Sequence, residues 1–469
     1  MSTDTTPTAG ERRLHGRLGP VGIVFMVVAA AAPLTVIGGN MPLAMGLGPG
    51  AGAPVGFLIA ALVLLVFSIG FVAMTPYVPE AGAFFSYVTQ GLGRRPGTGI
   101  AAVALIAYTA IQVGIYGYIG WAIGDTVTFY GGPELPWPLY SFATLAIVAV
   151  LGYRHIELSA KVLGVALILE IGIVVLLDLV IVADPGPAGL TLTSFDPAVF
   201  TSGPLGIAVL FALTGFIGFE ATAVFRDEAR DPERTIPRAT YAAVLIIGGF
   251  YALTAWAFVV AIGPDQVTEV AQRTLDGEGN MLLDTTDDKL GRIGRDVVNV
   301  LLLTSLFACV LSFHNVIARY QFALAGKGLL PQRLASVHDR HHSPAFSSVV
   351  QTVTAAVIVG ILAALGVDPL VGVFGSMAGV ATVGMVLLML TTSVAVLVYF
   401  TRHRDHAGGR VWQTRIAPAL ACVGLLGSLY LVLTNFTLVT GGSAALSTVL
   451  AAIPFVGFAL GCLARRRRA

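Results

Sequence analysis

Charged residues are scarce in this chain of 469 residues. Only 11% of the residues are Asp, Glu, Lys or Arg, whereas a soluble globular domain carries about 25%. So few charges cannot cover a water-facing surface of this size, which argues against a soluble enzyme. The net charge of +1 also provides no basic field that would attract a nucleic acid.

Cysteine and the sequence patterns of catalysis are scarce as well. Cys309, Cys422 and Cys462 lie far apart in apolar stretches and form no CxxC pair, so neither a disulfide framework nor a zinc site is expected. The chain contains no HExxH, GxSxG or GxxxxGK[ST] pattern, which argues against a zinc hydrolase, a serine hydrolase and an ATP-driven pump. The run HDRHH at residues 338–342 reads as a solvated loop. We therefore expect no enzymatic activity, no cofactor and no bound metal.

Apolar residues dominate what is present. They make up 56% of the chain, and the mean hydropathy is +0.85. A transmembrane helix needs about 20 apolar residues, so the chain has room for roughly a dozen spans. The apolar runs predict an all-α polytopic membrane protein with twelve spans, at residues 20–47, 52–76, 98–123, 138–153, 156–183, 204–225, 239–262, 296–322, 346–366, 370–400, 415–438 and 443–463.

The positions of the basic residues predict the orientation of these spans. If the N-terminus is cytoplasmic, all but four of the 27 Lys and Arg residues fall on the cytoplasmic side. The four exceptions lie together in an acidic outer loop, which we place at residues 263–295. We therefore expect both termini in the cytoplasm, a polar tail at residues 1–19, a basic tail at residues 464–469, and a multi-pass protein of the cell membrane. The amphipathic stretch 81–93 is too short to span and is predicted to lie along the membrane surface.

Two predicted spans carry residues that interrupt a helix. Span one contains Pro33 and then Gly38 and Gly39, and span six contains the run GFIG at residues 215–218. Breaks at corresponding places in two halves of a chain indicate a transporter with inverted repeats and a binding site near the midplane. Glycine and proline are also common in membrane helices as packing and kink residues, so the pattern alone leaves both interpretations open.

Three stretches of the sequence resemble the amino acid permeases of the amino acid–polyamine–organocation superfamily. The longest runs from FIGFE at residues 216–220 into EARDPERTIPRA at residues 228–239, which is similar to the signature E-x-x-[ND]-P-x-[RK]-x-[IL]-P-[RK]-A of the family. The two shorter stretches follow spans two and eight. They are PEAGAFFSYV at 79–88 with GLG at 91–93, and NVIAR at 315–319 with GLLP at 328–331 and SP at 343–344.

The resemblance implies a LeuT-like fold of two inverted five-helix repeats, at residues 20–183 and 204–400, followed by two additional helices at 411–463. It also implies that unwound backbone in spans one and six holds the carboxylate and amino groups of an amino acid. A free helix N-terminus suits a carboxylate, and free carbonyls suit an ammonium group. The binding residues expected in span six are Gly215, Phe216, Ile217 and Gly218.

The sequence departs from the family at the break of span one. Members usually carry a Gly-x-Gly segment there, whereas this chain has AAPLT at residues 31–35 and its glycines follow later. Pro33 has no N–H to donate. The substrate-contacting residues expected in span one are Ala32, Leu34 and Thr35.

Four ionisable residues fall inside predicted spans, namely Glu170, Asp178, Glu220 and His314. Glu170 lies where many permeases carry a lysine that is thought to bridge spans one, five and eight. A buried carboxyl group could take up a proton, attract a cation, or simply hold two helices together by a hydrogen bond. Glu220 matches an acidic position linked to proton-sensitive steps in some members, and it could also only anchor a helix. Asp178 is expected to face water at the rim, and His314 to join helices.

Several uncharged residues complete the candidate site. Phe216 and Phe313 fall where aromatic rings could gate a substrate path, although most membrane aromatics only pack. Gln112 and Tyr116 are four residues apart on one face of span three. They could line the pocket or join two helices.

Taken together, these residues predict a secondary active transporter that works by alternating access. We expect proton-coupled symport of a neutral amino acid, because no fixed positive side chain marks a site for an acidic substrate. The alternatives are an amino acid/amine exchanger, a polyamine importer of the same superfamily, or a membrane sensor on the same fold. The expected partners are a small amino acid, a proton and the lipid bilayer.

Overall fold

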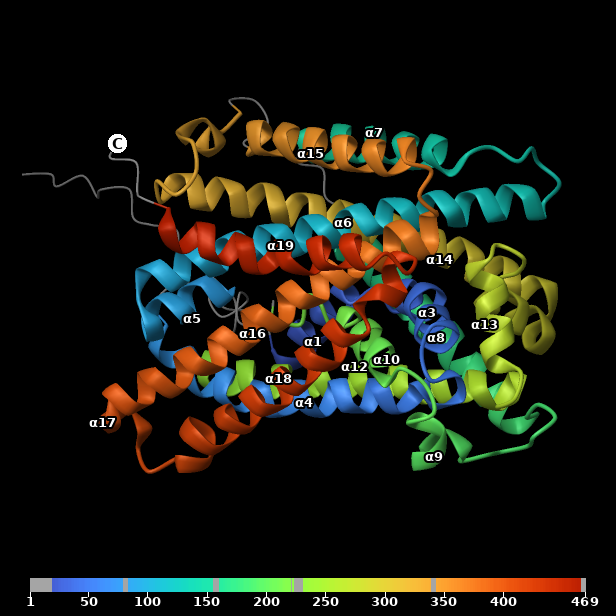
Figure 1. Cartoon of the computed structure of the whole chain (residues 1–469), viewed down its shortest axis with the longest axis horizontal. Coiled ribbons are helices and arrows are strands. Elements are labelled where there is room, and N and C mark those ends of the chain that lie inside the picture. The colour runs from blue at the N-terminus through green and yellow to red at the C-terminus, as the bar shows by residue number, and fades with distance from the viewer. Residues whose placement is uncertain are drawn as a thin grey trace, which may run out of the picture.

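The computed structural model describes residues 19–78, 83–154, 160–220, 222, 231–338 and 343–464. Every regular element within these residues is a helix, and the helices form one layered bundle (Figure 1). The elements of the first half are α1 (Pro20–Ala30), α2 (Pro33–Thr35), η1 (Val36–Asn40), α3 (Met41–Gly46), η2 (Gly50–Gly52), α4 (Ala53–Met74), η3 (Thr75–Tyr77), α5 (Ala83–Leu92), α6 (Arg94–Phe129), α7 (Trp137–Tyr153) and α8 (Ala160–Ala183).

The second half continues the same all-helical pattern. Its elements are η4 (Thr193–Phe195), α9 (Pro197–Phe200), α10 (Leu205–Thr214), α12 (Pro232–Ile262), α13 (Val267–Leu275), α14 (Met281–Gly326), η6 (Gln332–Ala335), α15 (Ala345–Ala364), η7 (Pro369–Gly375), α16 (Ser376–Arg402), α17 (Arg404–Ala407), η8 (Trp412–Ile416), α18 (Ala417–Thr434), η9 (Phe436–Thr440) and α19 (Ala444–Leu463).

The described helices overlap the predicted spans. Among the described residues, ten helical stretches are long and apolar enough to cross a membrane. Two shorter apolar helices, Trp137–Tyr153 and Leu205–Thr214, lie where the fourth and sixth spans are predicted. The chain is therefore a polytopic membrane protein, as its composition indicates.

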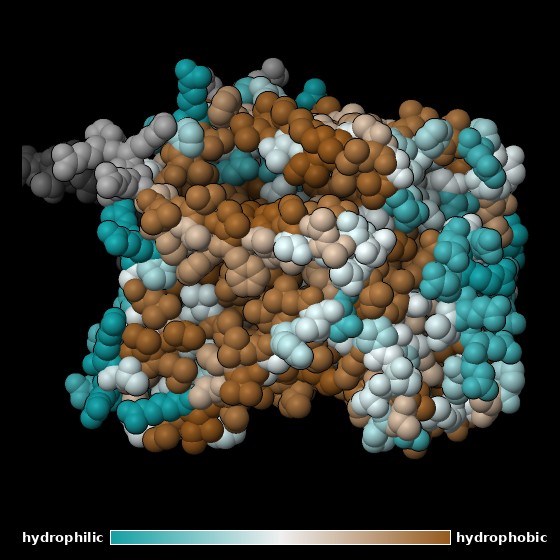
Figure 2. Space-filling model, in the orientation of Figure 1, coloured by the Kyte–Doolittle hydropathy of each residue, from teal (hydrophilic) through white to brown (hydrophobic). Residues whose placement is uncertain are grey.

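The surface has an apolar middle and two polar ends (Figure 2). Side chains such as Ile147, Ile168, Val353 and Val423 are exposed on the outer helices, as expected for a surface that faces lipid. One polar end carries α17 and the other carries α13 (Figure 1). We call them the basic end and the acidic end.

The acidic end is more ordered than the sequence suggests, because the predicted loop 263–295 contains two helical segments. The first is α13, which packs on α3 with Leu275 close to Gly46. The second is the start of α14, which is separated from the rest of that helix by Gly291 in a left-handed conformation (φ 71°). Asn280 donates to the carboxylate of Asp125 over 2.9 Å, which joins this segment to α6.

The C-terminal end of α6 is also fixed to α14 at the acidic end. The guanidinium group of Arg295 lies 3.7 Å from the ring centroid of Phe129, and Tyr130 donates a hydrogen bond to Asp296. This hydrogen bond to a carboxylate raises the pKa of Tyr130 above its ordinary value. The parts of α6 and α14 at the acidic end are thus held together by polar contacts.

The amphipathic stretch after span two is α5, which packs into the protein. Phe84, Tyr87 and Val88 are buried, and α5 contacts both α6 and α16. The ring of Tyr87 stacks on Phe71 of α4 at 4.4 Å between centroids. Neighbouring helices therefore cover the apolar face of α5, and its position along the membrane surface stays a prediction.

Candidate functional site

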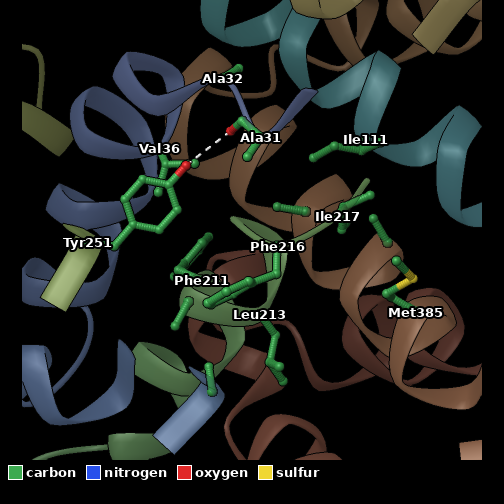
Figure 3. Packing of buried hydrophobic residues seen from close by; sticks show 14 of the residues in the cluster. Ala31, Ala32, Val36, Ile111, Phe211, Leu213, Phe216, Ile217, Tyr251 and Met385 are labelled. Atoms are coloured by element: carbon green, nitrogen blue, oxygen red, sulfur yellow. Dashed lines mark hydrogen bonds between the residues drawn. The ribbon is translucent and has the colours of Figure 1, made fainter. Parts of the chain in front are cut away.

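Span one breaks at Ala32. Helix α1 ends at Ala30, and Ala32 adopts a left-handed conformation (φ 45°, ψ 73°) before α2 begins at Pro33. Proline removes the N–H that would continue the helical ladder and disfavours the helical conformation in the preceding residue. The carbonyl oxygen of Ala31 is released from the helix and accepts a hydrogen bond from the hydroxyl of Tyr251 at 3.1 Å (Figure 3).

Span six breaks at the run of residues 215–220. Helix α10 ends at Thr214, and the chain continues in tight turns in which the amide of Phe216 donates to Leu213 and that of Ile217 to Thr214. Gly218 has a φ of 109°, which only glycine adopts readily. Figure 3 shows this turn facing the break of span one. The signature that follows lies outside the described residues at 228–230, and its remainder forms the start of α12.

A small cavity of about 30 Å³ lies between the two breaks. This volume suffices for one or two water molecules. None of the described residues that line it is acidic or basic. They are Ala31, Ala32, Thr35, Val36, Asn40, Ile111, Ile115, Thr214, Ile217, Cys309, Phe313 and Phe374.

Three polar side chains face this apolar cavity. The hydroxyl of Thr35 is buried and has no hydrogen-bond partner. The amide of Asn40 donates to the carbonyl of Phe211 at 2.8 Å, which joins span one to span six. The hydroxyl of Thr214 pairs with that of Thr382 on α16. Thr35 therefore offers the free polar group of the cavity.

Glu170 links three spans next to the cavity. Its side chain on α8 is 5% exposed and accepts a hydrogen bond from Ser305 of α14 at 3.0 Å. The backbone amide of Leu34, two residues after the break, also interacts with this carboxyl group. Spans one, five and eight thus meet at Glu170, although Glu170 itself does not line the cavity.

Glu220 joins span six to span three. One oxygen of its buried carboxyl group accepts a hydrogen bond from Tyr108 at 2.6 Å, and the other accepts from the amide of Gly218 at 2.9 Å. Tyr108 in turn lies beside Phe313 and Tyr320. Glu220 therefore fixes the end of the span-six break against α6.

Gln112 and His314 belong to a buried polar network between α6, α14 and α15. Gln112 is 3.4 Å from Nδ1 of His314, and Nε2 of His314 is 2.8 Å from the hydroxyl of Ser348. Gln351 donates to Gln112 at 2.7 Å. The prediction that His314 joins helices is confirmed. Gln112 takes part in the same connection, and the cavity is lined instead by Ile111 and Ile115.

The remaining predicted site residues divide between the cavity and the surrounding core. Ile217 and Phe313 line the cavity, and Gly215 lies against Val36 beside it. Phe216 is buried against Tyr251 with 6.3 Å between ring centroids, away from the cavity lining. Tyr116 is buried, and its carbonyl accepts from Ser141 of α7.

Asp178 differs from the sequence-based expectation. It is 5% exposed and accepts a hydrogen bond from Thr254 of α12 at 2.8 Å. The prediction of a water-facing rim residue was therefore wrong, because α12 covers this part of α8. Asp178 connects two helices.

Several cavity residues could not be singled out from the sequence. Asn40, Cys309 and Phe374 line the cavity but lie in ordinary apolar runs. Of these three residues, only Asn40 could have been noticed in the sequence, because it is a strongly polar residue inside span one. The described residues contain no group of His, Cys, Asp and Glu able to hold a metal ion, and residues 339–342 of the histidine-rich run lie outside them.

Two interrupted helices that flank a cavity in an apolar helical bundle are typical of membrane transporters. The chain matches the amino acid permease family over residues 18–460 and belongs to this family, within the amino acid–polyamine–organocation superfamily. Its members transport amino acids or amines and are not enzymes.

Individual relatives are distant and differ in what they carry. The branched-chain amino acid permease BcaP of Bacillus subtilis is 23% identical over 445 residues, which cover 91% of this chain and 89% of that protein. The low-affinity putrescine importer PlaP of Escherichia coli K12 is 22% identical over 360 residues, or 75% and 76% of the two chains. The serine/threonine exchanger SteT of B. subtilis is 21% identical over 281 residues, or 57% and 59%.

Proposed function

We propose that this permease is a proton-coupled symporter of neutral aliphatic amino acids that works by alternating access. The observation that carries this proposal is the cavity between the broken spans, which combines an apolar lining with the unpaired hydroxyl of Thr35. The backbone around Ala32 and the turn at residues 215–218 would hold the charged groups of the amino acid, and the apolar walls would hold its side chain.

The lining favours a neutral substrate over a dication or a dicarboxylate. A charged side chain is costly to bury without a partner of opposite charge, and the described lining offers none. Ile111, Ile115 and Phe374 suit an aliphatic side chain. The similarity to a branched-chain amino acid permease agrees with this substrate class.

The position of Glu170 suggests how a proton would be coupled. Its carboxyl group interacts with the amide of Leu34 at the start of the helical segment after the break, where a substrate carboxylate would also be attracted. Two carboxylates cannot both remain ionised at close range without a large repulsion. Substrate binding would therefore favour the protonated form of Glu170, so that the proton and the amino acid bind together.

We also propose a LeuT-like arrangement of twelve spans in the cell membrane. The repeats would be residues 20–183 and 204–400, with α18 and α19 as the two additional helices. In this arrangement the basic end and both termini would lie in the cytoplasm, as the positions of the Lys and Arg residues predict. A cysteine introduced at Arg273 in α13 should then be labelled from outside the cell, and labelling only from the cytoplasm would overturn the orientation.

Transport by purified protein in liposomes tests the function directly. We expect exchange of labelled leucine, isoleucine and valine, no uptake of glutamate or putrescine, and accumulation when a proton gradient is directed inward. One-for-one exchange that ignores the gradient would overturn the symport. Uptake of putrescine in place of the amino acids would overturn the substrate class, and no uptake of any amino acid or amine would overturn the function.

Glu170→Gln tests the coupling, and Asp178→Asn is its matched control. Both acids are 5% exposed on α8, but Asp178 contacts α12 rather than the break. Glu170→Gln should retain exchange and lose accumulation driven by the proton gradient, whereas Asp178→Asn should retain both. If Glu170→Gln still accumulates substrate at pH 5 to 8, the coupling role is wrong.

A further inference from the structure

Tyr118 stands out because its hydroxyl is buried without a partner. The residue lies on α6 and is 0% exposed, and its Oη atom makes no hydrogen bond. A tyrosine buried in a helical bundle normally finds a partner for this group. The ring lies 5.1 Å from that of Phe374 on η7 and 6.0 Å from that of Trp121, between centroids.

The ring occupies a space that exists only because two neighbouring residues of span one are glycines. A Cβ atom on Gly38 would lie 2.5 Å from Oη of Tyr118. A Cβ atom on Gly39 would lie 2.7 Å from the Cε1 atom of the Tyr118 ring and 2.9 Å from that of Phe374. Neither glycine has a positive φ, so the requirement for glycine here is one of space.

This contact lies on the part of the site nearer the acidic end. Along α6, Tyr118 follows the cavity residues Ile111 and Ile115 and precedes Asp125, which is bonded to the segment at the acidic end. Along span one, Gly38 and Gly39 follow Thr35 towards α3, which is covered by α13. The Tyr118 ring therefore connects α6, η1 and η7 in the outer half of the molecule.

We propose that Tyr118 is the latch that holds the outer half of span one against α6 and η7, and that its unpaired hydroxyl limits how stable this closed arrangement is. The proposal rests on the alternating-access function proposed above. Opening towards the acidic end would separate η1 from the Tyr118 ring and admit water to the hydroxyl. Closing removes that water and provides no replacement, so the hydroxyl weakens the latch.

The thiol of Cys309 can be used to measure this opening. Cys309 lines the cavity and is buried, so a membrane-impermeant thiol reagent added outside cells reaches it only when the outer half opens. Replacing Cys422 and Cys462 by alanine leaves Cys309 as the single thiol. The measured quantity is the rate at which Cys309 is labelled in whole cells, with full labelling after denaturation as the control for protein amount.

Two substitutions should change this rate in opposite directions. Tyr118→Phe removes the unpaired hydroxyl and keeps the ring, so labelling should become about fivefold slower or more. Gly38→Ala places a methyl group against Oη, so labelling should become faster. When Gly38→Ala is combined with Tyr118→Phe, the closest colliding atom is gone, and only the flexible ends of Leu282 and Leu302 remain, at 3.1 and 3.4 Å. The labelling rate should then return to within about twofold of that of Tyr118→Phe.

Gly39→Ala is the matched control for this rescue. Its methyl group would meet ring carbons of Tyr118 and Phe374, which Tyr118→Phe leaves in place. Gly39→Ala should therefore accelerate labelling by the same factor in the presence and absence of Tyr118→Phe. The latch proposal is overturned if Tyr118→Phe restores the slower labelling rate in both glycine variants or in neither of them. It is also overturned if Tyr118→Phe alone is labelled faster than the unchanged protein. Labelling from inside-out vesicles should not become faster in Gly38→Ala, and an increase there would also contradict an outer latch.

The labelling rates require no substrate, so the two proposals fail separately. If the rates follow the expected pattern while no amino acid is transported, the latch stands and the substrate assignment fails. If transport occurs as proposed while the rates do not follow the pattern, the function stands and the latch is wrong.

Discussion

The contact between α19 and α6 allows a graded prediction of stability. A Cβ atom on Gly461 of α19 would lie 2.7 Å from the Cα atom of Gly99 and 2.8 Å from the carbonyl oxygen of Thr98. One on Gly457 would lie 2.2 Å from the terminal carbon of Ile106. One on Gly427 of α18 would meet nothing within 4 Å. Alanine at these three positions should therefore have three different effects.

The magnitudes follow from what each methyl group meets. At Gly461 the obstacles are backbone atoms, so the helices must separate by roughly 1 Å and lose part of their dispersion contacts, at a cost of about 1–3 kcal/mol. At Gly457 the obstacle is the end of a flexible side chain that can rotate, and the cost should stay below about 1.5 kcal/mol. At Gly427 alanine should stabilise the helix by up to about 1 kcal/mol.

Thermal unfolding of the purified variants in detergent measures this order. We expect Gly427→Ala to be the most stable, followed by the unchanged protein, Gly457→Ala and Gly461→Ala. The same order should appear in the fraction of protein that stays monodisperse after heating. If Gly461→Ala is as stable as Gly427→Ala, the close packing of α19 on α6 is wrong.

Three substitutions at the span-one break have distinct expected outcomes. Ala32→Val should lower stability by roughly 2 kcal/mol or more and reduce transport, because a β-branched residue fits the left-handed conformation poorly. Thr35→Val should raise the thermal stability of the substrate-free protein, because it removes a buried hydroxyl whose missing hydrogen bond costs about 1–3 kcal/mol. The same substitution should weaken substrate binding. Asn40→Leu should remove the hydrogen bond from span one to the carbonyl of Phe211, which keeps only the amide of Gly215 at 3.2 Å, and lower stability by about 1–2 kcal/mol. Thermal unfolding and substrate-dependent stabilisation measure all three.

Each of these outcomes can fail in a specific way. An Ala32→Val variant that is as stable as the unchanged protein would contradict the backbone conformation at the break. Tighter substrate binding by Thr35→Val would exclude its hydroxyl as a substrate contact. An Asn40→Leu variant of unchanged stability would show that the bond between spans one and six contributes little.

The spans and the two breaks could be predicted from the sequence because they depend on local properties. Hydropathy marks an apolar helix regardless of its neighbours, and Pro33 and Gly218 act on the backbone at their own positions. Even so, the sequence could place the break of span one only within a short stretch of residues and not at a single residue. That Ala32, rather than a glycine, takes the left-handed conformation depends on its burial between other spans.

The cavity lining could be predicted only in part, because it depends on which helix faces which. The sequence cannot tell that Ile111 and Ile115 face the cavity while Gln112, next to Ile111, faces His314. The same limit applies to Asp178, whose burial requires α12 to lie over α8. Gly38 and Gly39 were recognised as unusual residues, but their close contact with Tyr118 follows only from the packing of span one against α6.

The small size of the cavity has a consequence for the energetic efficiency of the carrier. A volume of about 30 Å³ holds one or two water molecules, so an empty carrier that reorients in this contracted form would transfer almost no solvent and no hydrated ion across the membrane. In the proposed cycle the substrate would expand this site on entering it, and the apolar walls would close again when the substrate leaves. In the proton-coupled cycle proposed above, such an empty return step would be tight against leakage and would preserve the proton gradient between productive cycles.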